Sequence, residues 1–424
     1  MMRRLLTSAL ALATLASSLH AQRQGSGFAP DRLARIDRFM QSFVDSNRIG
    51  GAVGLVMRDG KVVYQKSVGY IDKESGRRMT PDAIFRIASQ SKAITSTAIL
   101  MLVEEGKIAL TDPVSRFIPE YAHTTVALAA DSGRTPVPAK RRITIKDLLT
   151  HTSGMSYGTD AFVAKQYETK QLGPAAGWGW YTADKEEPIC TSMERLASLP
   201  FVSQPGEAFV YGYSIDVLGC VVERASGMPL DEFVRTRITA PLGMNDTYFF
   251  LPPAKRARFV TLYTDSAGQL FRAPDGARGQ GHYVDGPRKN FSGGAGLVST
   301  AQDYARFLSM ILNHGEMNGV QYLSPKMIDL MTTNQIGSLY PAGQGFGLGF
   351  STVERLGADG LASVGSFGWG GAYGSNYKVD PAERLVIVFM INQLPNRTDI
   401  ASKFPTLVYQ ALVAPRVGAE RAQR

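Results

Sequence analysis

Apolar residues near the start of the chain recur at helical spacing, and two short strand patterns follow them. Residues 31–47 place their apolar positions on one face, which predicts an amphipathic helix. That face comprises Leu33, Ile36, Phe39, Met40 and Phe43. Residues 52–57 and 62–68 read as strands, and Asp59-Gly60 between them is a strong hairpin signal.

A second strand pair is expected near the other end, over 372–379 and 385–391, with a terminal helix at about 399–413. Helical patterns and Gly/Pro-punctuated loops dominate between these ends. This order predicts an α/β (α+β) fold, in which an antiparallel sheet built from both termini is flanked by helices. Within one domain over 22–424, we expect an α/β half at about 30–91 and 290–413 and an inserted, mostly helical subdomain at about 92–289. A ligand site would lie in the cleft between the two parts.

The first 21 residues have the pattern of a secretory signal peptide. Arg3 and Arg4 precede an apolar run, 5–19, and the small residue Ala21 offers a cleavage site. A membrane span needs about 20 apolar residues, so this run is too short for an anchor. We therefore expect a cleaved signal peptide at 1–21 and a mature protein that is secreted or periplasmic, with no stable membrane span; retention on a surface stays open.

Composition excludes several classes of protein. With 44% hydrophobic and 20% charged residues in 424, the chain is too apolar for disorder and long enough for a large core. The formal charge of +9 becomes +7 without the signal peptide. The densest basic runs, 140–142 and 255–258, lack the flanking aromatic residues that stack on bases, so we expect no nucleic-acid partner. These patterns do not predict an oligomeric state.

Neither a metal nor another cofactor is expected, because the chain has no His-Glu-x-x-His, no Cys-x-x-Cys and no acidic calcium loop. The two cysteines, Cys190 and Cys220, could pair in an exported protein. However, Cys220 falls in a periodic apolar stretch, 215–222, where a buried free thiol is common. Free thiols are the favoured interpretation, and a disulfide is the alternative.

Serine motifs supply the candidate nucleophiles. The Gly-x-Ser-x-Gly elbow of many serine hydrolases is absent, whereas Ser-x-x-Lys occurs twice, starting at Ser89 and at Ser375. Ser375 lies in a predicted strand, where residues three apart point to opposite faces. Lys378 therefore could not reach its hydroxyl group.

Ser89 follows a predicted strand, 83–87, and opens a helix that stops at Gly106. Residues three apart share a helix face, so Lys92 can hydrogen-bond the Ser89 oxygen. Burial can make a lysine a usable base toward serine, and free N–H groups at a helix N-terminus favour an oxyanion. A capping serine beside a solvated lysine would produce the same local sequence.

The segment Phe85-Arg86-Ile87-Ala88-Ser89-Gln90-Ser91-Lys92 resembles the nucleophile segment of the serine β-lactamase and penicillin-binding-protein superfamily. From about 30 to 413 the chain is similar to the esterase-like branch, which holds family VIII esterases and relatives of class C β-lactamases. Matching stretches follow in order at 54–60, 148–154, 294–300 and 369–371. The resemblance implies a β-lactamase/transpeptidase-like fold and a Ser89 nucleophile activated by Lys92.

The resemblance assigns further site residues. Tyr211 takes the position of the acid/base tyrosine, and Tyr213 replaces an asparagine that holds the amide side chain of β-lactams. Trp369-Gly370-Gly371 takes the position of Lys-Thr-Gly and would bind substrate, its glycines allowing the acyl group to approach the backbone closely. The backbone N–H groups of Ser89 and Ala372 would form the oxyanion hole.

Tryptophan in place of the Lys-Thr-Gly lysine removes a cation that would pair with a substrate carboxylate, a contact worth about 1.5–3 kcal/mol. We therefore expect a secreted serine esterase for short or medium acyl esters, with Ser89 acylated and Lys92 and Tyr211 moving protons. The alternatives are a β-lactamase, a D-amino-acid peptidase, an amidase or an acyltransferase using the same site. A non-catalytic cell-wall-binding homologue is disfavoured because all three residues are present.

Two other segments suggest weaker hypotheses. His151 and Ser153 have no assignable acidic partner, so we interpret 151–154 as a structural turn near the cleft and not as part of a Ser-His-Asp centre. The loop 158–200 holds Trp178, Trp180 and Tyr181, which indicates either a substrate-facing wall or ordinary packing.

Overall fold

Strands from the two ends of the chain meet at the centre of one antiparallel sheet. The computed structural model describes residues 27–127, 135–174 and 179–414, so the expected signal peptide lies outside the described residues. The sheet has eight strands in the order β12-β13-β14-β15-β16-β1-β2-β3. In this order they are β12 Gln344–Phe346, β13 Ser351–Val353, β14 Phe367–Gly370, β15 Asn376–Asp380, β16 Leu385–Ile391, β1 Gly51–Arg58, β2 Lys61–Asp72 and β3 Arg77–Arg78.

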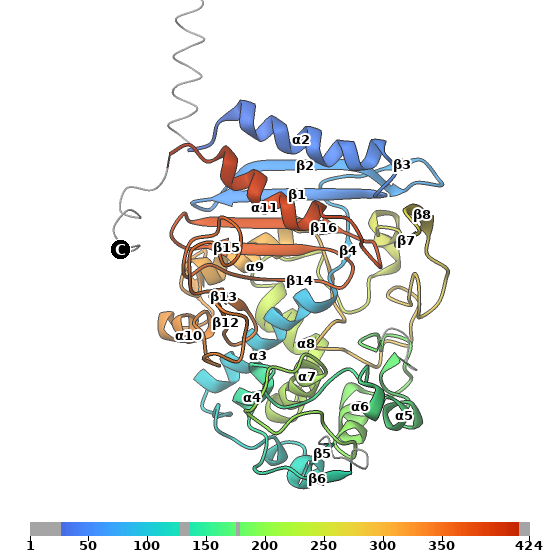
Figure 1. Ribbon diagram of the computed structural model, residues 1–424, viewed down its shortest axis with the longest axis vertical. Helices are drawn as coiled ribbons and strands as arrows, with labels where there is room; N and C mark the ends of the chain where they lie inside the picture. The colour runs from blue at the N-terminus through green and yellow to red at the C-terminus, as the bar shows by residue number, and fades with distance from the viewer. Residues whose placement is uncertain (1–26, 128–134, 175–178, 415–424) are drawn as a thin grey trace, which may run out of the picture.

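Helices cover both faces of the sheet (Figure 1). α2 (Pro30–Asp45) and α11 (Ile400–Ala411) pack together on one face, whereas α9 (Ala301–Leu312) packs against β1 and β16 on the other. The central strand β16 serves both layers, because its odd-numbered residues join the core under α2 and α11 and its even-numbered residues from 386 to 390 join the core under α9. Apolar residues on both faces are what a strand buried between two layers requires.

A mostly helical region lies on the far side of the sheet from α2 (Figure 1). Its centre is α3 (Ser91–Glu104) packed on α7 (Ser214–Ser226), and α7 also contacts α4 (Ile145–Leu149), α6 (Ile189–Leu196) and α8 (Leu230–Val234). The other helices and strands are α5 Ala161–Thr169, α10 Pro325–Met331, β4 Phe85–Arg86, β5 Thr125–Ala127, β6 Pro136–Pro138, β7 Tyr263–Ser266, β8 Gln269–Arg272, β9 Val298–Ser299, β10 Glu316–Met317 and β11 Val320–Gln321. Within the described ranges no helix has the length and apolarity that a membrane span needs.

The predicted α/β (α+β) class is confirmed, because the sheet combines strands from both termini and is flanked by helices. One predicted strand is shorter than expected. Residues 371–375 form a turn in which the Gly371 N–H donates to the Ser375 carbonyl oxygen at 2.7 Å. Gly374 has φ +92°, which breaks the extended conformation, so β15 begins only at Asn376.

The favoured interpretation of two free thiols is wrong. Cys190, in the first turn of α6, and Cys220, in the middle of α7, form a disulfide across the packed pair of helices. The apolar pattern correctly indicated that Cys220 is buried. It carried no information on which residue of the neighbouring helix lies opposite.

Candidate active site

Ser89 lies in a sharp turn between a strand and a helix. A one-turn 3-10 helix, Ala88–Gln90, joins β4 to α3, so the regular helix begins at Ser91 and not at Ser89. Ala88 has φ +43°, a left-handed conformation that costs a residue with a Cβ roughly 1–3 kcal/mol. The turn brings Ser89 to the surface of a cavity of about 450 Å³.

Lys92 makes the hydrogen bond that its spacing from Ser89 predicted. Its Nζ lies 3.1 Å from Ser89 Oγ and also donates to Tyr157 Oη at 2.9 Å and to the Gly294 carbonyl oxygen at 2.8 Å. The side chain is buried, and it makes no ion pair with any carboxylate in the described part of the chain. Three acceptors match the three N–H groups of an ammonium, so Lys92 is held in one orientation beside the nucleophile.

Tyr157 is a site residue that the sequence did not reveal. It lies in the loop after the 151–154 turn, and its hydroxyl oxygen accepts the Lys92 hydrogen bond. Burial, followed by the neighbouring Tyr211, raises the pKa of Tyr157 well above its ordinary value, so its hydroxyl group stays protonated. No spacing rule links it to Ser89 or Lys92; the turn at 151–154, expected near the cleft, was the available signal.

Tyr211 lies on the other side of the same lysine. Lys92 Nζ is 4.6 Å from the centre of the Tyr211 ring, within the range of a cation–π interaction. The Tyr211 hydroxyl oxygen accepts a hydrogen bond from Trp369 Nε1 at 3.0 Å. Thus the structure brings Ser89, Lys92, Tyr211 and Trp369 together, as expected. The hydrogen bond of the Tyr211 hydroxyl group is with Trp369, whereas Lys92 contacts the Tyr211 ring.

The cavity at Ser89 has an uncharged, largely aromatic lining. Its lining residues are Ser89, Tyr157, Trp180, Tyr211, Trp369, Gly370 and Ala372. Trp180 belongs to the loop that was expected to form either a wall or ordinary packing, and it lies in the wall. Ser89 and Ala372, the pair assigned to the oxyanion hole, lie at the same cavity. None of these seven described lining residues has a cationic side chain that could pair with a substrate carboxylate.

Two residues expected to bind substrate, Tyr213 and Gly371, are not among the residues that line this cavity. Tyr213 is fully buried; its hydroxyl group accepts from the Gly173 N–H and donates to the Gly179 carbonyl oxygen. A Cβ on Gly371 would lie 2.5 Å from the Ile87 carbonyl oxygen. Glycine at position 371 therefore allows the 371–375 turn to pack closely on the turn that holds Ser89. The sequence had suggested a different reason for this glycine, namely close approach of the acyl group to the backbone.

The remaining sequence candidates have structural roles. The Ser375 hydroxyl group bonds the Ile391 backbone, while Lys378 pairs with Asp359. His151 is buried in a turn with φ +55°, packs 4.7 Å from the Tyr211 ring, and makes no side-chain hydrogen bond with the described residues. Burial, and then the Lys92 charge, hold the pKa of His151 well below its ordinary value.

Tyr181, from the same loop as Trp180, is buried, and its hydroxyl group accepts the His282 backbone N–H. Trp178 lies outside the described residues. Of the three aromatic residues that drew attention to this loop, the structure therefore describes Trp180 in the cavity wall and Tyr181 in the packing behind.

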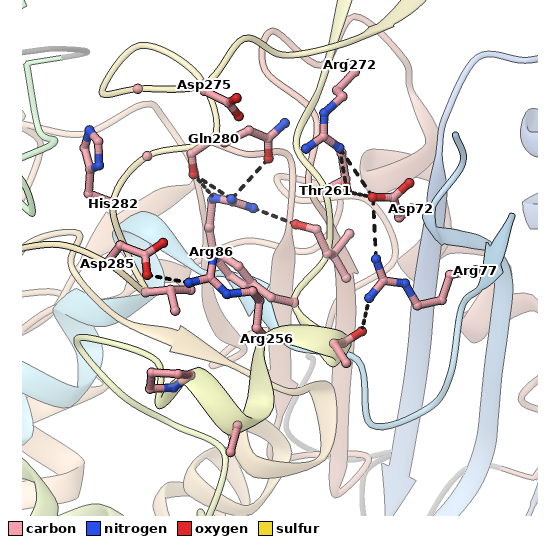
Figure 2. A pocket seen from close by; sticks show the side chains of 18 residues that line it. Asp72, Arg77, Arg86, Arg256, Thr261, Arg272, Asp275, Gln280, His282 and Asp285 are labelled. Carbon is pink, nitrogen blue, oxygen red and sulfur yellow. Dashed lines mark hydrogen bonds and ion pairs between the residues drawn. The ribbon is translucent and has the colours of Figure 1, made fainter. Parts of the chain in front are cut away.

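A larger and more polar cavity, of about 800 Å³, shares none of these lining residues (Figure 2). Its floor holds the buried Arg86 guanidinium, which donates at 2.6 Å to each of the Val260 and Gln280 carbonyl oxygens and lies over the Phe259 ring. The hydrogen bonds from Arg86 fix the chain that leads into the nucleophile turn. Neither Ser89 nor Lys92 is among the described residues that line this cavity, so we place the candidate active site at the smaller cavity.

Comparison with known proteins identifies the family of the chain. A family model described as Beta-lactamase matches residues 36–409. Esterase EstB of Burkholderia gladioli is 34% identical over 376 residues, covering 85% of this chain and 90% of EstB. Lovastatin esterase of Penicillium rubens is 32% identical over 347 residues, covering 79% and 82%. A solved structure described as EstCE1, a hydrolase with promiscuous acyltransferase activity, has a TM-score of 0.75 at 28% identity, covering 91% of this chain and 99% of that one. The chain therefore belongs to the beta-lactamase family, as a serine hydrolase with esterase relatives.

Proposed function

We propose that the protein is an exported carboxylesterase that cleaves short or medium acyl esters through an acyl-enzyme on Ser89. The observation that carries this proposal is Lys92 Nζ, placed 3.1 Å from Ser89 Oγ at a cavity whose described lining residues are all uncharged. Lysine supplies the base that a serine nucleophile needs, and an uncharged aromatic lining suits a neutral acyl group.

Acylation begins when neutral Lys92 accepts the Ser89 proton and Ser89 Oγ attacks the ester carbonyl carbon. The carbonyl oxygen then carries the negative charge of the tetrahedral intermediate. We assign its stabilisation to the backbone N–H groups of Ser89 and Ala372, because both residues line the cavity. One such donor is typically worth about 10²–10³ in kcat.

Tyr211 is the proposed proton donor to the leaving alcohol. Its oxygen accepts the Trp369 Nε1–H, so its own O–H is available to another acceptor. Trp369 and the Lys92 charge both support negative charge on that oxygen after the proton leaves. The ammonium formed on Lys92 then returns a proton to Tyr211, and protonated Tyr157 keeps Lys92 in place.

Deacylation repeats these transfers with water. Water gives a proton to the Lys92–Tyr211 pair and attacks the acyl carbon, the Ser89–acyl bond breaks, and Ser89 regains its proton. If an alcohol occupies the position of water, the same steps transfer the acyl group to it. Acyl transfer is the second candidate function, supported by the activity named for the similar EstCE1 structure.

Export is also a proposal. It is supported by the signal-peptide pattern at 1–21 and by the disulfide between Cys190 and Cys220, since stable disulfides are typical of exported proteins. Mass spectrometry of the mature N-terminus, from protein expressed with its leader in a bacterial host, tests it. Export would give a chain that begins after Ala21 and is recovered outside the cytoplasm.

The deciding experiment compares purified wild type with Ser89→Ala on p-nitrophenyl butyrate and on a chromogenic cephalosporin. We expect turnover of the ester in the wild type, no turnover in Ser89→Ala, and slower turnover of the cephalosporin. Ser375→Ala is the matched control, because it alters the serine of the other Ser-x-x-Lys copy and should keep activity. Ester turnover in Ser89→Ala would reject the nucleophile, and faster cephalosporin turnover would reject the substrate class.

A further inference from the structure

Asp216 is a buried carboxylate that the proposed mechanism does not yet use. It lies in the first turn of α7 and has no exposed surface. Its Oδ1 accepts hydrogen bonds from Ser292 Oγ at 2.5 Å and from the Gly294 backbone N–H at 3.1 Å. Its Oδ2 has no hydrogen-bond partner among the described residues. A buried carboxylate with one unsatisfied oxygen is costly unless a nearby positive charge compensates it.

One residue, Gly294, connects Asp216 to Lys92 through its two backbone polar groups. The Gly294 N–H donates to Asp216, and the Gly294 carbonyl oxygen accepts from Lys92 Nζ at 2.8 Å. A Cβ on Gly294 would lie 2.3 Å from Asp216 Oδ2, so glycine is what allows the carboxylate to approach this backbone. Asp216 therefore fixes a hydrogen-bond acceptor of Lys92 and brings a negative charge to the same region.

We propose that Asp216 is a positioning residue of Lys92, which it holds through the backbone of Gly294, and also its buried counter-charge. As a counter-charge it stabilises the ammonium form of the lysine. This inference rests on the proposed role of Lys92 as the base toward Ser89. When Lys92 takes the Ser89 proton, a positive charge appears in a region shielded from water. A fixed carboxylate nearby lowers the free energy of that charged form.

Other titratable groups near Lys92 do not supply this charge. Tyr157 and His151 face it from the 151–157 segment, and Tyr211 faces it from the segment before α7. Tyr157 is kept protonated by burial and His151 is kept neutral, so neither balances an ammonium. For Asp216 itself, burial raises the pKa above its ordinary value, and the Lys92 charge is the largest influence in the opposite direction.

The test is the pH dependence of Ser89 labelling by a fluorophosphonate probe, in wild type and in Asp216→Asn. Asparagine keeps the shape and an acceptor oxygen but removes the charge. Because Lys92 must lose its proton to act, the labelling rate rises with pH. We call this rising part of the pH profile the acidic limb. Without the carboxylate, neutral Lys92 is favoured, so we expect this limb to move to lower pH by about one unit or more, and the maximal rate to fall several-fold.

Asp303→Asn is the matched control. Asp303 is also a buried carboxylate that accepts a backbone N–H, from Asp246 at 2.7 Å, and a hydroxyl hydrogen bond from Thr247. Its loss should lower the melting temperature without moving the acidic limb. If Asp216→Asn does not fold, Asp216→Ser removes the same charge with a smaller side chain and carries the same expectation.

The outcomes separate this inference from the function on which it rests. A folded neutral variant whose acidic limb stays at the wild-type pH would overturn the role of Asp216 alone. A wild-type chain that the probe does not label at Ser89 would overturn the proposed function, and this inference with it. If the acidic limb moves by the same amount in Asp303→Asn as in Asp216→Asn, the shift results from general destabilisation, and the counter-charge role is rejected.

Discussion

Replacing Trp369 by phenylalanine should slow acylation by alkyl esters much more than acylation by a p-nitrophenyl ester. Phenylalanine keeps an aromatic ring against Tyr211 and Phe346, whose ring centres lie 5.4 and 5.3 Å from that of Trp369. It removes the Nε1–H that donates to the Tyr211 oxygen at 3.0 Å, together with the part of the indole that exceeds a phenyl ring. In the proposed mechanism, that hydrogen bond strengthens as Tyr211 gives up its proton to the leaving alcohol.

The size of the effect follows from this one hydrogen bond. A hydrogen bond to a charged oxygen is worth about 1.5–3 kcal/mol, and about 1.36 kcal/mol corresponds to a tenfold change in rate. We therefore expect kcat/KM for ethyl butyrate to fall about 10- to 150-fold in Trp369→Phe. For p-nitrophenyl butyrate we expect little change, because p-nitrophenolate leaves without a proton. Both esters give the same acyl-enzyme, and kcat/KM reports acylation alone in each case.

Trp180→Phe is the control for this experiment. Trp180 lines the same cavity, so its replacement also enlarges the site, but it leaves the hydrogen bond between Trp369 and Tyr211 intact. It should alter kcat/KM for the two esters by the same factor. The reasoning is refuted if Trp369→Phe lowers kcat/KM for both esters by the same factor. It is also refuted if Trp180→Phe lowers kcat/KM for ethyl butyrate much more than for p-nitrophenyl butyrate.

Three further changes test other parts of the structure. Tyr157→Phe should lower kcat/KM for both esters about tenfold or more, because the lysine beside the nucleophile loses one acceptor; steady-state kinetics measure this. Gly371→Ala should lower activity and the melting temperature together, since the new Cβ would lie 2.5 Å from a carbonyl oxygen of the nucleophile turn. Serine at both Cys190 and Cys220 should remove about 3–4 kcal/mol of unfolding free energy in urea titrations, from loss of a crosslink between residues 30 apart.

Matched variants accompany these changes. Tyr121→Phe also removes a buried tyrosine hydroxyl group, which donates to the Met193 carbonyl oxygen at 2.8 Å, and should keep activity. Gly370→Ala should lower the melting temperature less than Gly371→Ala does, because the atom nearest to its Cβ would be 3.3 Å away and not 2.5 Å. Equal losses in a variant and its control would contradict the corresponding prediction. The disulfide prediction fails if the double serine variant unfolds at the wild-type urea concentration.

The spacing of apolar and polar residues was sufficient to predict features that involve residues only a few positions apart. The strand expected at 385–391 is β16, and the expected pairing of Ser89 with Lys92 is present, because both depend on spacings of a few residues. Tyr157 was not predictable in this way. It is 65 residues from Lys92, and its contact with the lysine exists only because the loop after the 151–154 turn packs against α3. The disulfide between α6 and α7 was left open for the same reason.

The difference between the two tyrosines is also a property of the fold. Both are close to Lys92, but Tyr157 is buried with its oxygen occupied by the lysine, whereas Tyr211 receives an N–H from Trp369. Trp369 therefore has two roles, of which the sequence indicates only the first. The family resemblance implies that Trp369 stands where a lysine would bind a carboxylate. In the proposed mechanism, its Nε1–H also stabilises the Tyr211 oxygen when Tyr211 gives its proton to the leaving alcohol. Substituting lysine for Trp369 would restore a charge but remove this indole donor. In the proposed function, preference for neutral esters and protonation of the leaving alcohol are thus linked through one side chain. An attempt to change the substrate class at this position should also change the acid chemistry.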